Sequence, residues 1–103
     1  DRIVLVDFYA EQLHSWCGPC HALSPVLKKL TTERVAGSGC KLDLVTVDIE
    51  DEANGGFDLG QQYKASRAIR ALPTVYAFRG GKPLTSFVGA LNESGVEEFL
   101  DKL

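Results

Sequence analysis

The chain is poor in the residues that build metal sites, haem sites and disulfide-rich folds. Its 103 residues include no methionine, two histidines and three cysteines. This odd and low number of cysteines argues against a small secreted fold held together by disulfides, and it favours a reducing intracellular compartment. A domain of this size can also bury a core without such cross-links. The cysteines are therefore available for chemistry.

Long apolar runs and basic clusters are also missing. No stretch approaches the roughly 18 apolar residues of a membrane span, and no targeting sequence is recognised. Eleven Lys and Arg against 14 Asp and Glu leave a net charge of −3. This balance predicts neither nucleic acid nor an anionic membrane as a partner. Residues 1–103 are expected to form one soluble globular domain, working as a monomer, with no internal linker or repeat.

The most informative motif is Trp16-Cys17-Gly18-Pro19-Cys20. Two cysteines with this spacing can be bridged in the first turn of a helix, where proline is tolerated. The helix N-terminus would stabilise the thiolate of the first cysteine, so Cys17 is the expected nucleophile. Cys20 would be less exposed and positioned to resolve a mixed disulfide. The motif predicts a dithiol redox site.

Hydrophobic patterning along the chain alternates between strand and helix. Continuous apolar runs indicate buried strands, and apolar residues three or four apart indicate helices. Strands are predicted at 3–10, 42–49, 74–78 and 84–88, and helices from the cysteine pair to about Arg34, at 57–69, and from Ser94 onward. Residues 79–83 are expected to form the hairpin connection, and Ser94 and Glu97 a capping box.

The predicted order of elements is β-α-β-α-β-β-α. Strands separated by helices indicate right-handed parallel crossovers, while the final hairpin adds an antiparallel edge. We expect an α/β fold with a central mixed β-sheet flanked by helices.

Four segments in order, Val4–Ala10, Trp16–Cys20, Ala71–Thr74 and Val88–Ala90, resemble the thioredoxin family. The resemblance spans nearly the whole chain and implies a thioredoxin-like fold reduced to its minimal core, because the strand and helix that normally precede Ile3 are absent. It also implies a protein-disulfide reductase that acts on client proteins, needs no bound cofactor or metal, and is recycled by a thioredoxin reductase. Organellar members are similar, so the cytoplasm and the mitochondrial matrix are the expected compartments.

The resemblance also implies roles for individual residues. Pro73 matches the cis-proline that faces the dithiol. Gly18 and Pro19, between the two cysteines, match residues that support the active site. Asp7 matches the buried carboxylate that accepts a proton from Cys20, and burial raises a carboxyl pKa toward the working pH. The residues that match the client-binding groove are Trp16, Leu72, Pro73, Thr74 and Gly89.

Several positions depart from the family pattern. Residues 11–15 add roughly four residues, about one helical turn, before the motif. The segments 49–63 and 63–73 are also longer than in the family. Thr46 stands where many relatives have a lysine that partners the buried aspartate. We therefore expect client choice and the tuning of Asp7 to differ here.

Other interpretations of the cysteines stay open at this point. Cys17, Cys20 and His21 satisfy the C-x-x-C-H pattern of haem attachment, and His14 adds a possible zinc or iron–sulfur ligand. The absence of methionine and of further histidines argues against haem. His21 is expected on the exposed face of the helix, where its protonated form would favour the thiolate. Cys40 has no cysteine nearby and is expected to be a bystander thiol.

A second functional hypothesis uses the same groove without redox turnover. The longer loops could reshape the dithiol site and leave a protein-binding or chaperone module. That hypothesis predicts client binding that survives the loss of both thiols, whereas the reductase hypothesis predicts that mixed disulfides disappear with Cys17→Ser.

Overall fold

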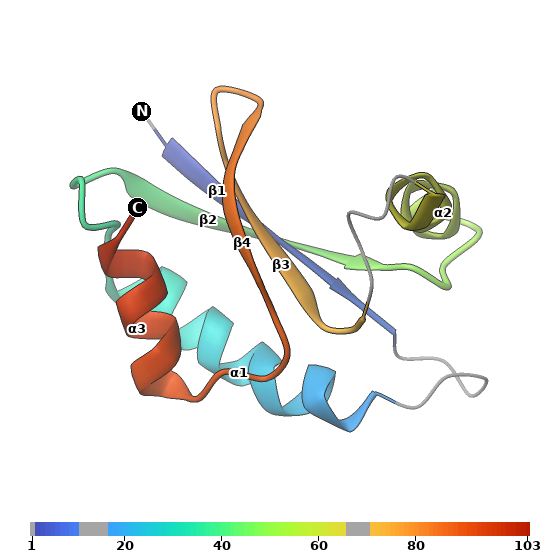
Figure 1. The fold of residues 1–103 in the computed structure, drawn as a ribbon, viewed down its shortest axis with the longest axis horizontal. Helices are drawn as coiled ribbons and strands as arrows, with labels where there is room; N and C mark the ends of the chain where they lie inside the picture. The colour runs from blue at the N-terminus through green and yellow to red at the C-terminus, as the bar shows by residue number, and fades with distance from the viewer. Residues whose placement is uncertain (1, 11–16, 66–70) are drawn as a thin grey trace.

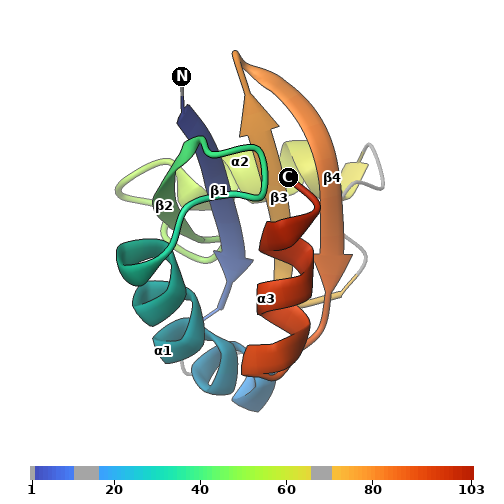
Figure 2. The same cartoon turned by 90° about the vertical axis from the view of Figure 1, so that its left-hand side faces the viewer.

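The computed structural model describes residues 2–10, 17–65 and 71–103. The described strands are β1 (Arg2–Tyr9), β2 (Lys41–Asp48), β3 (Thr74–Arg79) and β4 (Lys82–Val88), and the described helices are α1 (Gly18–Glu33), α2 (Gly56–Ala65) and α3 (Glu93–Asp101). The sheet order is β2-β1-β3-β4. Helices α1 and α3 cover one face, and α2 lies on the other (Figures 1 and 2). The predicted α/β fold with a mixed sheet is confirmed.

One of the two predicted parallel crossovers is wrong. Strand β1 is parallel to β2, as expected, but antiparallel to β3. Figure 1 shows α2 at the end of the sheet where β1 and β2 end. This helix has ten residues, a length of about 15 Å. The chain therefore enters β3 from that end, pairs Thr74 with Phe8, and runs back along β1.

The hairpin is tighter than predicted. Strands β3 and β4 extend to Arg79 and Lys82, so only Gly80 and Gly81 form the turn rather than residues 79–83. Their φ angles are +60° and +79°, which glycine adopts without steric cost and which suit the twist of a two-residue hairpin. Pro83 is accommodated beside a bulge because β4 is an edge strand.

Helix α3 begins differently from the prediction. Asn92 is its N-cap, and its side-chain oxygen accepts a hydrogen bond from the Gly95 backbone N–H at 2.8 Å. The predicted capping box is wrong because Ser94 already lies inside the helix, while Glu97 accepts a hydrogen bond from Arg34 at 3.1 Å. Asparagine is among the strongest N-cap residues.

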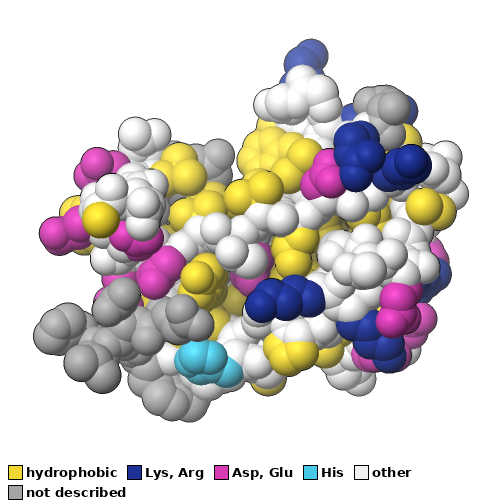
Figure 3. Space-filling model, turned by 180° about the vertical axis from the view of Figure 1, so that it is seen from behind, with side chains coloured by type: hydrophobic (Ala, Val, Ile, Leu, Met, Phe, Trp, Pro, Cys, Tyr) yellow, Lys and Arg dark blue, Asp and Glu magenta, His cyan; other side chains and the backbone are white. Residues whose placement is uncertain are grey.

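The main core lies between the sheet and the pair α1 and α3. Its fully buried members include Ile3, Leu5, Leu23, Leu27, Val75, Ala77, Val96 and Leu100. A smaller cluster on the α2 face is formed by Phe8, Ala10 and Ile49. Figure 3 shows hydrophobic side chains still exposed beside α2 on this second face. Side chains two and four residues apart along a strand lie on the same face, so Asp7 shares its face of the sheet with Ile3 and Leu5. This is the face that α1 and α3 cover.

Candidate functional site

The two cysteines of the motif meet at the start of α1. Cys17 caps the helix and is joined by a disulfide to Cys20, with a Cα–Cα distance of 5.2 Å. The Cys20 backbone N–H donates to the Cys17 carbonyl at 3.2 Å and lies 3.3 Å from the Cys17 Sγ. Gly18 and Pro19 occupy the first turn. The local sequence thus places the Cys17 sulfur among backbone donors that favour an anion.

Exposure does not separate the two cysteines as the sequence led us to expect. Cys17 is 5% exposed and Cys20 is 3% exposed. Both residues are buried in the disulfide form. A nucleophilic role for Cys17 therefore depends on its place at the helix terminus and not on greater exposure.

Asp7 is a buried carboxyl on the same side of the sheet as α1. It is 3% exposed, and within the described part of the chain its Oδ1 has no hydrogen-bond partner. Burial raises the pKa of Asp7 from 3.8 to about 6. Its neighbour in the β1–β2 ladder is Thr46, which is uncharged. A carboxyl of this kind can exchange a proton near neutral pH.

Four of the predicted groove residues meet where β3 begins and β4 ends. The Leu72–Pro73 peptide bond is cis, and the Pro73 carbonyl accepts a hydrogen bond from the Gly89 N–H at 2.9 Å. Gly89 has a φ of +94°. Thr74 is 1% exposed, and its hydroxyl donates to the Ala71 carbonyl. The Thr74 side chain thus shapes this turn and is not available on the surface.

The cysteine pair and the proline turn lie at one end of the sheet. Figures 1 and 2 both show the start of α1 at the end where β1 and β4 finish and β3 begins. Trp16, His14 and the rest of residues 11–16 lie outside the described residues, as do residues 66–70. The predictions on the longer loop, on the Trp16 contact and on the end of α2 are therefore not tested.

A small polar cavity adjoins Cys20 on the side facing β2. It has a volume of about 120 Å³ and is lined by Tyr9, Cys20, His21, Ser24, Lys28 and Thr46. The sequence analysis did not single out Ser24 or Lys28. Their spacing from His21, three and seven residues along α1, is the signal that would have placed them on one helix face.

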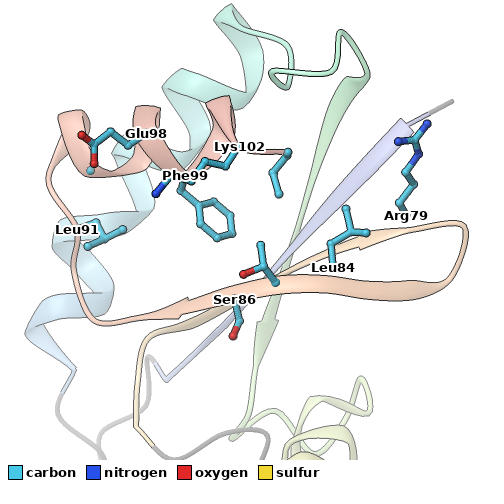
Figure 4. A pocket seen from close by; sticks show the side chains of 10 residues that line it. Arg79, Leu84, Ser86, Leu91, Glu98, Phe99 and Lys102 are labelled. Atoms are coloured by element: carbon cyan, nitrogen blue, oxygen red, sulfur yellow. The ribbon is translucent and has the colours of Figure 1, made fainter.

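A larger pocket is remote from this chemistry. It lies between β4 and α3, with a volume of about 710 Å³. In Figure 4 the Phe99 ring points from α3 toward β4, a strand that lines the pocket through Leu84 and Ser86. No cysteine lines this pocket, so it is not a candidate for the dithiol reaction.

The described residues, 2–10, 17–65 and 71–103, bear on the metal and membrane expectations. In these ranges no three His, Cys, Asp or Glu side chains gather as metal ligands would. His14, which the zinc alternative requires, lies outside them. None of the described helices has the length and apolarity needed to cross a bilayer. Cys40 is a free thiol, buried in the main core.

Comparisons with known proteins agree on one family. The family model described as Thioredoxin matches residues 1–102. Mitochondrial thioredoxin of Mus musculus is 40% identical over 100 residues, covering 97% of this chain and 51% of that protein. Thioredoxin of Chlorobaculum thiosulfatiphilum is 32% identical over 102 residues, covering 99% and 80%. The chain thus spans about half the length of the mammalian mitochondrial relatives.

Solved structures give the same result. The germline-specific thioredoxin Deadhead of Drosophila melanogaster superimposes with a TM-score of 0.72 at 29% identity, covering 100% of this chain and 82% of that one. A mutant thioredoxin of Halobacterium salinarum gives a TM-score of 0.71 at 25% identity, covering 99% and 74%.

Proposed function

Because the chain belongs to the thioredoxin family, we propose that it is a thiol–disulfide oxidoreductase that reduces disulfides in client proteins. The observation that carries this proposal is the Cys17–Cys20 disulfide at the N-terminus of α1. A pair that closes within one helical turn can pass between dithiol and disulfide with little rearrangement of the fold.

The first step begins from the reduced dithiol. The Cys17 thiolate, stabilised by the N-terminus of α1, attacks one sulfur of the client disulfide. The client S–S bond breaks as the new bond to Cys17 forms. One client sulfur leaves as a thiolate and takes up a proton, while the other is held in a mixed disulfide.

The second step releases the client. Cys20 loses its thiol proton to Asp7, and the resulting thiolate attacks the Cys17 sulfur. The mixed disulfide breaks, the second client thiolate leaves and is protonated, and the Cys17–Cys20 disulfide forms. Two electrons have passed from the dithiol to the client. A thioredoxin reductase, as the proposed partner, would return the pair to its dithiol form.

The client would lie across the proline turn. We assign its docking to the backbone at Leu72 and Pro73, to the surface at Gly89, and to Trp16. Pro73 has no N–H of its own, which leaves the Leu72 backbone free to pair with an extended client segment. Val88 adds an apolar contact that the sequence analysis missed, since it is 53% exposed beside Gly89. The mitochondrial relatives favour the mitochondrial matrix as the compartment, with the cytoplasm as the alternative.

The test is dithiothreitol-driven reduction of insulin, followed as turbidity, for the parent chain and for Cys17→Ser. We expect the parent to accelerate precipitation and the variant to match the uncatalysed rate. Equal rates for both would refute the reductase. Client binding that persists when Cys17 and Cys20 are both replaced by serine would then support the binding-module hypothesis.

A further inference from the structure

The cavity beside Cys20 has a neighbour between α1 and β2 with which it shares lining residues. A second, open groove of about 390 Å³ runs along the same two elements and is lined by Thr31, Thr32 and Leu44, among others. Lys28 and Thr46 line both the inner cavity and this groove. These two side chains therefore belong both to the cavity that Cys20 lines and to the open groove beside it.

The described charged side chain of the inner cavity is a cation. Among the described residues, Lys28 is the one lysine or arginine that lines the inner cavity, and none of the described aspartates or glutamates lines it. Within the described ranges, no carboxylate forms an ion pair with the Lys28 ammonium. Asp43, the carboxylate of the outer groove, is already bound by Arg2 through contacts of 2.5 and 2.6 Å.

Asp7 lies one strand away from this junction. It is the ladder partner of Thr46, and directly paired residues of neighbouring strands project to the same face of the sheet. The Asp7 Oδ1 is buried without a hydrogen-bond partner in the described part of the chain. Cys20 and Asp7 are the groups that exchange a proton in the proposed resolving step. Both thus lie near the Lys28 ammonium, which comes from α1.

We propose that Lys28 is a positioning residue for the resolving step, whose ammonium acts across the cavity to favour the Cys20 thiolate and the Asp7 carboxylate. This inference depends on the proposed reductase function. The Cys20 proton still goes to Asp7, and the thiolate still attacks the Cys17 sulfur and displaces the client thiolate. Lys28 neither gives nor takes a proton; it lowers the free energy of the charged forms.

Water weakens this effect without removing it. A polar cavity of about 120 Å³ is large enough for several water molecules. Lys28 therefore acts through a screened medium rather than by direct contact. We expect its loss to lower the population of the Cys20 thiolate about threefold to tenfold at neutral pH.

Besides Cys20 and Lys28, two titratable side chains of the described residues line the cavity: Tyr9 from β1 and His21 from α1. A lysine ammonium keeps its charge near neutral pH, whereas histidine is the side-chain type whose charge can change between pH 5 and 8. A neutral substitution at Lys28 is therefore expected to shift the whole pH profile.

The experiment separates the two chemical steps of one turnover. The reduced chain, with Cys40→Ala as background, is mixed with dithiobis(nitrobenzoate) in a stopped-flow instrument. Attack by Cys17 releases the first nitrothiobenzoate, and attack by Cys20 releases the second. The variants are Lys28→Gln, Lys28→Arg, and Lys29→Gln as the matched control, because Lys29 pairs with Glu93 at 3.0 Å on the neighbouring helix.

We expect Lys28→Gln to slow the second phase about threefold to tenfold at neutral pH, with the first phase unchanged and the rate recovering as the pH rises. Lys28→Arg should restore the parent profile, and Lys29→Gln should match the parent. Equal second phases for Lys28→Gln and Lys29→Gln would overturn the inference while leaving the reductase intact. A parent chain that releases no second nitrothiobenzoate would overturn the reductase proposal itself.

Discussion

Replacing Asp7 by asparagine should stabilise the fold at neutral pH. The Asp7 carboxyl is 3% exposed, and burial raises its pKa from 3.8 to about 6. Its ionised form is therefore less favourable in the folded state than in the unfolded chain. At about 1.4 kcal/mol per pKa unit, this difference costs the parent about 3 kcal/mol above pH 6. A small domain has a total stability of about 5–15 kcal/mol, so the gain is measurable.

The sign of the pH dependence follows from the same pKa values. Because the folded pKa lies above the unfolded one, the cost is present in full above about pH 6 and disappears as the pH falls below 3.8. The gain from Asp7→Asn should therefore shrink steadily over that interval. The buried amide also lacks a partner, so about 3 kcal/mol is an upper value.

The assay is urea unfolding of the oxidised parent and of Asp7→Asn at several pH values between about 4 and 7.5. Glu98→Gln is the matched control, because it removes a negative charge from an exposed position on α3. We expect the control to change stability little at any pH. An Asp7→Asn variant that is less stable than the parent at neutral pH, or whose effect does not change with pH, would refute the reasoning.

Three further predictions test the fold around the site. Asn92→Ala should lower the free energy of unfolding by about 1 kcal/mol through loss of the α3 cap, whereas Ser94→Ala should have a smaller effect; equal losses in urea unfolding would contradict the observed cap. Gly89→Ala should lower it by about 1–2 kcal/mol because its φ is +94° although its surroundings are open, and an unchanged thermal midpoint would contradict this. Cys40→Ala should leave insulin reduction at the parent rate, since Cys40 is a free thiol in the core; a loss of activity without a loss of folded protein, checked by circular dichroism, would assign Cys40 a role in the reaction.

Features that depend on neighbours along the chain could be predicted from the sequence. The spacing of Cys17 and Cys20, with Pro19 between them, allows few geometries other than the first turn of a helix. The apolar runs likewise located the strands to within a residue or two, because burial on both faces requires continuous hydrophobicity. The order of elements and the family followed from these local patterns.

Features that depend on competition between local signals were predicted less well. Two helix starts are plausible from the local sequence: a cap at Ser94 with Glu97, or a cap at Asn92 with Gly95. The structure has the second, and Glu97 is bound instead by Arg34 at the C-cap of α1. The hairpin was placed correctly, but its turn shortened because two adjacent glycines with positive φ let the strands pair to their ends.

The direction of β3 and the environment of the site were decided by the tertiary structure alone. Strand β3 runs antiparallel to β1 because α2 lies at the end of the sheet where β2 ends. The residues near Thr74 carry no signal of this placement. The sequence determined that Asp7 lies in a buried strand, but its raised pKa requires that no partner reach it. One cavity is lined by Cys20 and Lys28 from α1 and by Thr46 from β2. Lys28 and Thr46 are 18 positions apart in the sequence, and only packing of the helix on the strand brings them together.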